Sequence, residues 1–185
     1  MFDAVTSAGD AGARRNRSAV FFDRDGVLNE DRGYIHTPGE FAWMPGAIES
    51  VKWLNDTGRL VLVVTNQSGI ARGVYTEEEY LAFERWISER LAEQGAHVDA
   101  WYHCPHHPTE GLGDLCTECD CRKPAPGMVL RALEEWGLRP ERCVLIGDKE
   151  SDMAAAAAAG VPGVLFRNGD LLSVVRASAP AVDEA

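Results

Sequence analysis

Five short apolar segments predict the strands of one sheet. Residues 19–22, 60–64 and 143–146 are continuous apolar runs with no alternation of polar and apolar positions. Such runs are typical of strands that are covered on both faces, as in the parallel sheets of α/β proteins. Residues 98–103 and 161–166 are weaker strand candidates.

Segments with apolar side chains at helical spacing lie between these runs. Thr76 and Glu79 form a capping box, in which each side chain satisfies a backbone N–H at the start of a helix. Glycines follow the segments, as is common at helix C-termini. The helices expected from these signals run from Gly46 to Asn55, from Thr76 to Gly95, from Pro126 to Gly137 and from Ser151 to Ala159.

Strands and helices alternate along the chain, and this order predicts a doubly wound α/β domain with a mostly parallel, Rossmann-like sheet. The domain is expected to span residues 19–177, because no repeat or linker divides that part of the chain. Residues 1–18 are expected to form a flexible leader and residues 178–185 a flexible tail.

Polar residues stand at the ends of three predicted strands. Asp23, Thr65 and Asp148 each come at the end of an apolar run. Because the carboxyl ends of parallel strands meet at one edge of a sheet, where ligands bind in open α/β proteins, we expect these side chains to converge.

The segment Asp23-Arg24-Asp25-Gly26 carries two carboxylates two residues apart. Strand alternation points both the same way, and like charges so close repel unless a cation or a proton separates them. Together with Asp148 they predict a Mg²⁺ site, because this ion prefers carboxylate oxygens. We expect Asp23 to attack the phosphorus of a substrate and form an aspartyl-phosphate. We expect Asp25 to protonate the leaving alcohol and then to deprotonate the hydrolytic water.

Phosphoryl transfer also needs hydrogen-bond donors and cations around the phosphate oxygens. Residues 65–69 offer a hydroxyl, an amide and backbone N–H groups, and Arg122 and Lys123 offer two cations. Each signal alone is common in turns or on surfaces. Because four separate segments supply the parts of one site, together they favour an enzyme that handles a phosphate group.

Residues 104–125 have no regular periodicity, and an irregular loop of this length needs something to hold its shape. Cys104 and His106 form one pair of metal-ligand residues, and Cys119 and Cys121 form another. Four thiolate and imidazole ligands suit tetrahedral Zn²⁺ and leave no open position for water. The sequence therefore predicts a structural zinc loop at residues 104–121, directly before the two cations.

Alternatives remain open for the cysteines. Cys116 and Cys119 also have a zinc-like spacing, so Cys116 could replace Cys104 or His106 as a ligand. The cysteines could instead be free thiols. Cys143 lies in a predicted strand and is expected to be a buried thiol.

Composition excludes several classes of protein. The chain has 18 Lys and Arg against 29 Asp and Glu, a net charge of −11. This balance argues against nucleic acid as a partner, but not against a small phosphorylated substrate, which needs only a local cluster of cations and a metal. No apolar run is long enough to span a membrane, and the N-terminal residues do not follow the order of a signal peptide. We expect a monomeric enzyme of the reducing cytoplasm.

The candidate residues resemble the motifs of the haloacid dehalogenase-like phosphatase superfamily. Its DxDG motif is similar to residues 23–26, its strand-ending Thr to Thr65, its lysine to Lys123 and its acidic motif to residues 147–152. Over roughly residues 19–168 the chain further resembles the D-glycero-D-manno-heptose 1,7-bisphosphate 7-phosphatases, through residues 22–29, 33–34, 64–73, 104–108 and 119–124.

This resemblance implies a Mg²⁺-dependent phosphatase that removes the C7 phosphate of a heptose bisphosphate and leaves heptose 1-phosphate. It implies Asp23 as the nucleophile and Asp25 as general acid and base. It implies Mg²⁺ held by the Asp23 and Asp148 side chains and the Asp25 carbonyl, with Thr65 and Lys123 stabilising the transferring phosphoryl group. The implied substrate contacts are Asp31, Arg32, Gly33, Tyr34, Thr65, Asn66, Gln67, Ser68, Arg122, Lys123 and Lys149.

Several functional alternatives stay open beside this reading. Histidinol-phosphate phosphatases share almost the same motifs. A zinc-stabilised binding module and a nucleic-acid-end phosphatase are further alternatives, against which the intact catalytic set and the acidic charge argue. We expect Asp152 to orient Lys149 or its loop rather than to bind metal, and we expect no large cap domain over the site.

Overall fold

A five-stranded parallel sheet forms the centre of the molecule. The structure, a computed structural model, describes residues 17–182. The strands are β1 (Ala19–Phe22), β2 (Leu60–Asn66), β3 (Ala100–Cys104), β4 (Cys143–Gly147) and β5 (Gly163–Leu165). Their order is β3-β2-β1-β4-β5, and every neighbouring pair is parallel. The chain builds outward from β1 on one side and then on the other, which places a topological switch point beside β1.

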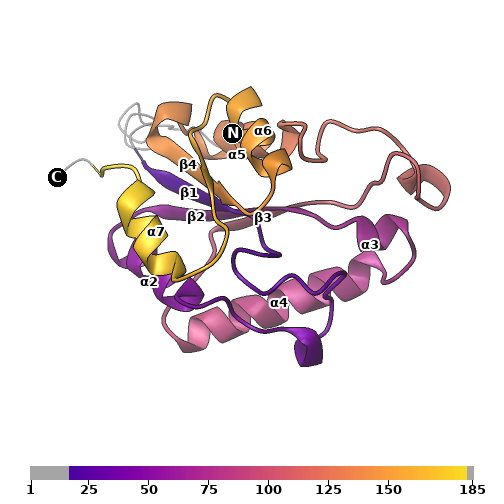
Figure 1. Cartoon of the computed structure of the whole chain (residues 1–185), viewed down its shortest axis with the longest axis horizontal. Helices are drawn as coiled ribbons and strands as arrows, with labels where there is room; N and C mark the ends of the chain where they lie inside the picture. The colour runs from indigo at the N-terminus through magenta and orange to yellow at the C-terminus, as the bar shows by residue number, and fades with distance from the viewer. Residues whose placement is uncertain (1–16, 183–185) are drawn as a thin grey trace, which may run out of the picture.

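Helices cover both faces of this sheet. They are α2 (Ala47–Asp56), α3 (Ser68–Ala71), α4 (Glu77–Glu93), α5 (Gly127–Trp136), α6 (Glu150–Ala158) and α7 (Leu171–Ser178), with 3₁₀ turns η1 (Pro38–Glu40), η2 (Gly113–Leu115) and η3 (Pro140–Arg142). Helices α2, α4 and α7 pack on one face, and α5 and α6 pack on the other (Figure 1). This is the doubly wound architecture that the sequence predicts.

Alternation along β1 divides the core into two layers. Val20 and Phe22 pack into the layer under α2, α4 and α7, whereas Ala19 and Phe21 pack into the layer under α5 and α6. All four side chains are fully buried. A strand that is apolar at every position is therefore required here, because both of its faces are covered.

The predicted strands and helices are confirmed, with shifts of a few residues at their ends. Both hydrogen bonds of the Thr76–Glu79 capping box are present. The sequence pattern does not predict the single-turn helix α3 or the C-terminal helix α7, which Asp170 caps by accepting a hydrogen bond from the Ser173 N–H.

The chain stays against the domain after α7. The carbonyl of Pro180 accepts a hydrogen bond from Arg59, and that of Ala181 accepts one from Ser18. The ordered part of the chain thus extends past the boundary expected at residue 177. Residues 1–16 of the expected leader and residues 183–185 of the expected tail lie outside the described residues.

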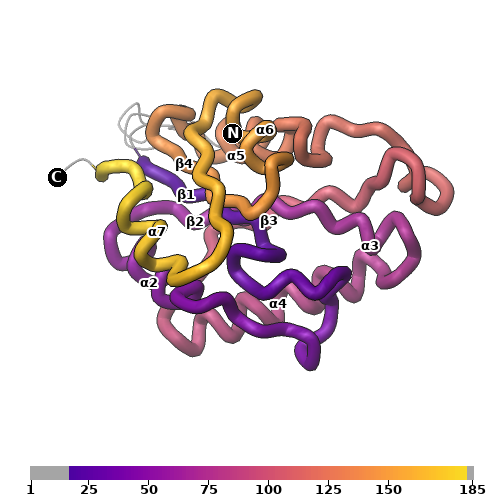
Figure 2. Tube along the Cα trace, viewed as in Figure 1, coloured from indigo at the N-terminus to yellow at the C-terminus, as the bar shows by residue number. Residues whose placement is uncertain are grey.

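Two long connections leave the carboxyl edge of the sheet. One joins β1 to α2 through residues 23–46, and the other joins β3 to α5 through residues 105–126. The second connection runs beside α3 (Figure 2), where the Ala71 N–H donates to the Pro105 carbonyl and the Leu112 N–H to the Ala71 carbonyl. Within residues 17–182 neither connection forms a separate cap domain.

Candidate active site

A pocket of about 640 Å³ opens at the carboxyl ends of the central strands. Both long connections and the N-terminus of α6 contribute to its wall. The geometry is the one expected from parallel strands, whose carboxyl ends meet at one edge. Among the residues proposed from the sequence, the pocket is lined by Asp23, Asp25, Asp31, Gly33, Tyr34, Thr65, Asn66, Gln67, Ser68, Arg122, Lys123 and Lys149.

The innermost part of the pocket is a buried cluster of charges around Lys123. Its Nζ lies 2.9 Å from Oδ1 of Asp23 and 2.6 Å from Oδ1 of Asp152. The same ammonium donates to the Val64 carbonyl at 2.8 Å. All three charged side chains are buried. One cation therefore faces two carboxylates, which leaves excess negative charge inside the site.

Burial and neighbouring charges shift the pKa values in this cluster. Burial raises the pKa of Asp23 to about 6; Lys123 lowers it, whereas Asp152 and Asp25 raise it. Burial lowers the pKa of Lys123, but the Asp23 and Asp152 carboxylates outweigh it, so the net pKa is raised. At neutral pH the lysine is protonated, and Asp23 is an anion that is more basic than an ordinary aspartate.

Three carboxylates form a set that fits a hard cation. Asp23, Asp148 and Asp152 offer oxygens that all lie within 4.8 Å of one another. Oδ1 of Asp148 is buried and has no hydrogen-bond partner among the described residues, and burial raises the pKa of this carboxyl. A bound divalent ion would satisfy that oxygen and offset the repulsion between the carboxylates.

Gly26 allows the strand-end motif to approach this carboxylate set. Its φ is 92°, in the left-handed region. A Cβ at this position would lie 2.3 Å from Oδ2 of Asp148, far inside van der Waals contact. The glycine of the DxDG segment is therefore required both for the turn and for the close approach of the backbone to Asp148.

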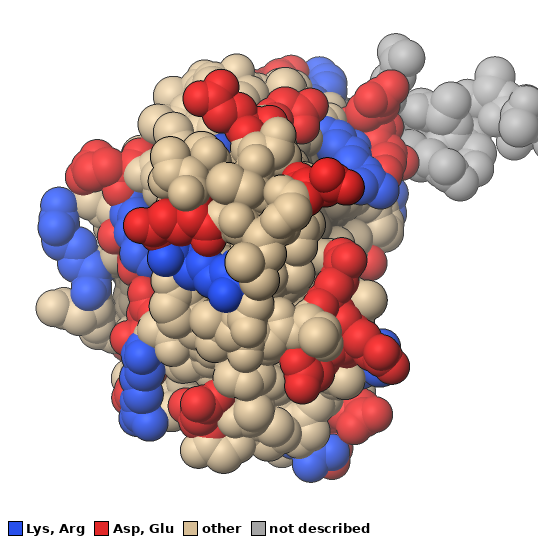
Figure 3. Space-filling model, turned by 90° about the vertical axis from the view of Figure 1, so that its right-hand side faces the viewer, with Lys and Arg blue, Asp and Glu red and all other residues tan. Residues whose placement is uncertain are grey.

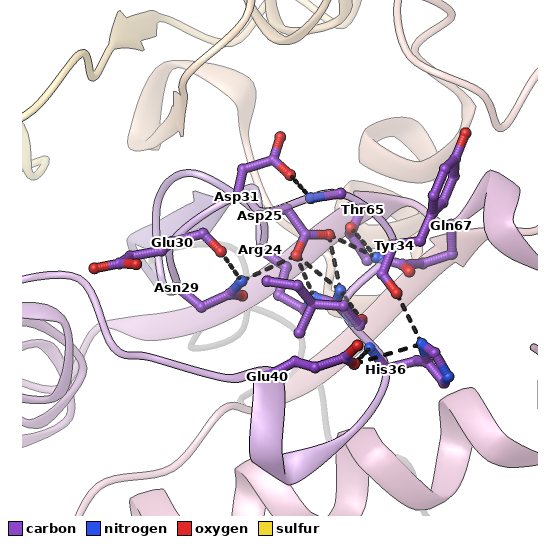
Figure 4. A network of polar contacts seen from close by, with 12 residues as sticks. Arg24, Asp25, Asn29, Glu30, Asp31, Tyr34, His36, Glu40, Thr65 and Gln67 are labelled. Carbon is purple, nitrogen blue, oxygen red and sulfur yellow. Dashed lines mark hydrogen bonds and ion pairs between the residues drawn. The ribbon is translucent and has the colours of Figure 1, made fainter.

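The Asp25 carboxyl lies in a hydrogen-bond network at the pocket wall (Figure 4). Arg24 Nη2 lies 2.8 and 2.9 Å from its two oxygens. Asn29 Nδ2 donates to Oδ1 at 3.0 Å, and Gln67 Nε2 donates to Oδ2 at 3.1 Å. Gln67 also donates to the Thr65 hydroxyl at 2.8 Å. The side chains that follow β1 are thus joined to those at the end of β2.

Lys149 joins the acidic motif after β4 to the connection after β1. Its Nζ lies 2.9 Å from Oδ2 of Asp31 and 3.8 Å from Oδ2 of Asp148. Burial lowers the pKa of Lys149, but these carboxylates reverse the shift and raise it above its usual value. The pocket is therefore lined by the basic side chains of Arg122, Lys123 and Lys149 together with four aspartates, which are Asp23, Asp25, Asp31 and Asp152.

The predicted zinc ligands lie together. The Sγ atoms of Cys104, Cys119 and Cys121 are 3.1 to 3.5 Å apart, and Nδ1 of His106 lies 3.4 Å from Sγ of Cys121. These separations are close to the ~3.7 Å edge of a tetrahedron with ~2.3 Å Zn–S bonds. Cys116 is exposed and outside the cluster, its Sγ 3.9 Å from the Pro108 carbonyl, so its alternative role as a ligand is not supported.

Hydrogen bonds connect the cysteine cluster to the pocket. The Gln67 N–H donates to the Cys104 carbonyl at 2.8 Å. Asn66 and Lys123 exchange two hydrogen bonds between the amide side chain of one and the backbone of the other, at 2.9 and 3.0 Å. The loop after β2 is therefore anchored to the segment that carries the cysteine cluster and to the backbone of Lys123.

Some site residues differ from the sequence expectation. Arg32 does not line the pocket; its guanidinium is exposed and donates to Glu30 at 2.9 Å. Asp152 orients the Lys149 loop, as expected, by accepting a hydrogen bond from the Lys149 N–H at 3.0 Å. Its ion pair with Lys123 is not predicted. Tyr75 also lines the pocket, although it lies in no motif, and so does His107, to which the motif at residues 104–108 assigns no role.

The molecular surface at this end of the sheet carries both signs of charge. Figure 3 shows acidic and basic side chains interspersed over the face beyond the strand ends. In residues 17–182, no helix combines the length and the apolar character needed to cross a membrane.

Comparisons with known proteins identify relatives of this chain. A HAD-hydrolase-like family model matches residues 120–179. The chain is 45% identical over 154 residues to D-glycero-beta-D-manno-heptose-1,7-bisphosphate 7-phosphatase of Pasteurella multocida, and to that of Vibrio cholerae, with 83% of each chain covered. The crystal structure of D,D-heptose 1,7-bisphosphate phosphatase from B. bronchiseptica, complexed with magnesium and phosphate, is 31% identical with a TM-score of 0.74, covering 89% of this chain and 88% of that one.

The sheet order, the aspartate after β1 and the match to a HAD-hydrolase-like model define a haloacid dehalogenase-like hydrolase. Within that class the relationship is narrower. The chain belongs to the D-glycero-β-D-manno-heptose-1,7-bisphosphate 7-phosphatase family, as its identity to relatives over most of both chains shows. The resemblance drawn from the motifs is therefore confirmed.

Proposed function

We propose that this protein hydrolyses the 7-phosphate of D-glycero-β-D-manno-heptose 1,7-bisphosphate and releases heptose 1-phosphate and inorganic phosphate. The observation that carries the proposal is the 45% identity to relatives named for this reaction. The buried Asp23–Lys123 pair at the base of the pocket gives the reaction a nucleophile and a cation.

The first half of the reaction transfers the phosphoryl group to Asp23. Its ionised carboxylate forms an O–P bond while the bond between phosphorus and the C7 oxygen breaks. Burial keeps this carboxylate poorly solvated and basic, in accord with its raised pKa of about 6. Lys123 lies beside it and the Thr65 hydroxyl lines the same pocket, and both stabilise the charge on the transferring group.

Asp25 takes part in both halves. In the first half it gives its proton to the C7 oxygen as that oxygen departs, and in the second half the resulting carboxylate takes a proton from the water that attacks the aspartyl-phosphate. Inorganic phosphate then leaves, and Asp23 is a free carboxylate again. The Asp25 carboxyl lines the pocket and is held there by Arg24.

The carboxylate set of Asp23 and Asp148, with the Asp25 backbone carbonyl, is proposed to hold Mg²⁺. This ion supplies charge neutralisation between the anionic nucleophile and the anionic phosphate. The fit rests on the unpaired buried oxygen of Asp148. Asp152 stays with Lys123, its partner at 2.6 Å, rather than with the ion.

Electrostatics favour a bisphosphate over a substrate with a cationic tail. Lys149 on the pocket wall is paired with Asp31, whereas the Arg122 guanidinium lines the pocket and donates to the backbone carbonyl of His106. Arg122 would therefore attract the second phosphate of the heptose ligand. The same guanidinium would repel the ammonium group of histidinol phosphate.

A panel of substrates tests this choice. We expect kcat/KM for β-heptose 1,7-bisphosphate to exceed that for histidinol phosphate by at least about 100-fold. The reason is that the Arg122 guanidinium attracts the second phosphate of the first substrate and repels the ammonium group of the second. Initial rates of phosphate release with both esters in the presence of Mg²⁺ measure the ratio. A higher kcat/KM for histidinol phosphate would overturn the proposed substrate.

The cluster of Cys104, His106, Cys119 and Cys121 is proposed to hold a structural Zn²⁺ ion. Four protein ligands complete a tetrahedral shell, so the ion would brace the loop rather than take part in hydrolysis. The hydrogen bond that the Gln67 N–H donates to the Cys104 carbonyl would connect the bound ion indirectly to the pocket. Thiolate ligands also suit the reducing cytoplasm, where we propose that the protein acts as a monomer.

Removal of one ligand tests the zinc site. We expect Cys119→Ser to reduce bound zinc from about one ion per chain to a small fraction and to lower kcat/KM at least about tenfold. Metal analysis of the purified protein and phosphate-release rates measure the two effects. The matched control is Cys116→Ser, an exposed thiol outside the cluster, which should change neither value. Zinc retained at full stoichiometry in Cys119→Ser would contradict the assignment.

A further inference from the structure

We propose that Arg24 is a positioning residue for the Asp25 carboxyl, and that Gln67 holds the same carboxyl from the side of β2. Neither side chain needs to touch the substrate. The inference rests on the proposed function in one respect, which is that Asp25 acts as general acid and base. It assigns a role to Arg24, which occupies the variable position of the DxDG motif.

Arg24 grips Asp25 with two nitrogens (Figure 4). Its Nε and Nη2 lie 3.1 and 2.8 Å from Oδ1, and Nη2 lies 2.9 Å from Oδ2. On its other side Nη2 donates to the Ile35 carbonyl at 2.7 Å. The rings of Tyr80 and Phe83 flank the guanidinium, with centroids 5.8 and 5.5 Å from Cζ. The guanidinium is therefore held in place by contacts other than its pair with the Asp25 carboxyl.

Gln67 completes the clamp from the neighbouring strand. Its Nε2 donates to both Asp25 and Thr65, and its Oε1 accepts a hydrogen bond from the Tyr75 hydroxyl at 2.6 Å. The Tyr75 hydroxyl thus fixes which end of the amide faces the carboxyl. Gln67 is only 2% exposed, and its amide group is hydrogen-bonded to other side chains of the protein. We therefore assign it to positioning, in place of the direct substrate contact expected from the sequence.

Stability alone does not explain this arrangement. Arg24 is a buried cation, and its Nη1 has no hydrogen-bond partner within residues 17–182. An unpaired buried donor destabilises a fold, and a buried ion pair can often be replaced by apolar side chains without loss of stability. The guanidinium instead contacts both oxygens of a single carboxylate, which lies on the pocket wall.

The orientation of Asp25 matters in both proton transfers. The carboxyl O–H bond breaks as the proton passes to the departing oxygen, while the P–O bond to that oxygen breaks and the bond to Asp23 forms. Later the carboxylate accepts a proton from water. A carboxyl free to rotate spends less time at hydrogen-bonding distance from either oxygen, so both transfers slow.

Comparison of two leaving groups isolates this effect. The heptose C7 alkoxide is a poor leaving group that needs protonation, whereas p-nitrophenolate leaves without it. We expect Arg24→Lys to lower kcat/KM for the heptose bisphosphate by about 100-fold but to change kcat/KM for p-nitrophenyl phosphate by less than about threefold. Because kcat/KM covers the steps up to phosphoryl transfer, the later role of Asp25 as base does not affect this comparison.

Two further variants keep the test decisive. Arg131→Lys makes the same change at an exposed pair with Glu135 and should leave both substrates unaffected. If circular dichroism shows that Arg24→Lys does not fold, Asn29→Ala replaces it, because it removes the Nδ2 donor to Oδ1 of Asp25 and leaves the Gln67–Thr65 hydrogen bond intact. The same selective loss on the heptose ester is expected.

Equal losses for both substrates, or no loss for either, in a folded variant would overturn the positioning role. Failure of the proposed function has a different signature, in which the wild-type protein hydrolyses another alkyl phosphate but not the heptose bisphosphate. In that case the effect of Arg24→Lys on this other alkyl ester is compared with its effect on p-nitrophenyl phosphate. A wild-type protein without activity on any phosphate ester would overturn both.

Discussion

Asp23→Asn is expected to lower kcat by at least about 10⁴-fold while the protein stays folded, because the variant loses its nucleophile. An amide of the same shape cannot form the aspartyl-phosphate. It also replaces one of the two carboxylates that face Lys123, at 2.9 Å, with a neutral group. Phosphate release at saturating substrate measures the loss, and circular dichroism verifies the fold.

Asp56→Asn provides the matched control for this experiment. Asp56 forms an exposed ion pair with Lys52 on α2, and neither residue lines the pocket. The same chemical change there should leave kcat unchanged. Turnover by Asp23→Asn within tenfold of the wild-type value would show that another group attacks phosphorus.

Lys123→Met is expected to abolish most activity and to reduce the free energy of unfolding by about 3–5 kcal/mol, because it leaves carboxylates buried without their cation. Lys123 is 3% exposed and lies between Asp23 and Asp152. Its removal therefore brings two desolvated negative charges into direct repulsion. Urea unfolding in magnesium-free buffer measures the loss of stability, and phosphate release measures the loss of activity.

Lys52→Met is the control for stability. It removes the cation of an exposed pair, whose contribution is at most about 1 kcal/mol because water screens both charges. An equal effect of the two lysine substitutions would contradict the account of a buried charge cluster.

The parts of the fold that the sequence predicts are those that local pattern determines. The strands at 19–22 and 143–146 are apolar at every position, since helices cover both faces of the sheet. The single-turn helix α3 is too short for any periodicity to show. Helix α7 has an N-cap in Asp170, but the helix is only eight residues long, so its apolar periodicity is weak.

The candidate site divides in the same way. Asp23 and Thr65 are predictable because parallel strands bring their ends together. The Lys123–Asp152 ion pair and the Arg24 clamp are not, since they depend on how separate loops fold back over the strand ends. Because successive side chains along an extended chain point to opposite sides, the sequence does not predict that the Arg24 guanidinium contacts the Asp25 carboxyl.

The most direct test of the account follows both phosphates of β-heptose 1,7-bisphosphate by ³¹P NMR during hydrolysis in the presence of Mg²⁺. The account predicts that the C7 phosphate signal is replaced by inorganic phosphate while the C1 phosphate signal persists. Loss of the C1 phosphate, or a bisphosphate left intact by protein that hydrolyses other esters, would contradict it.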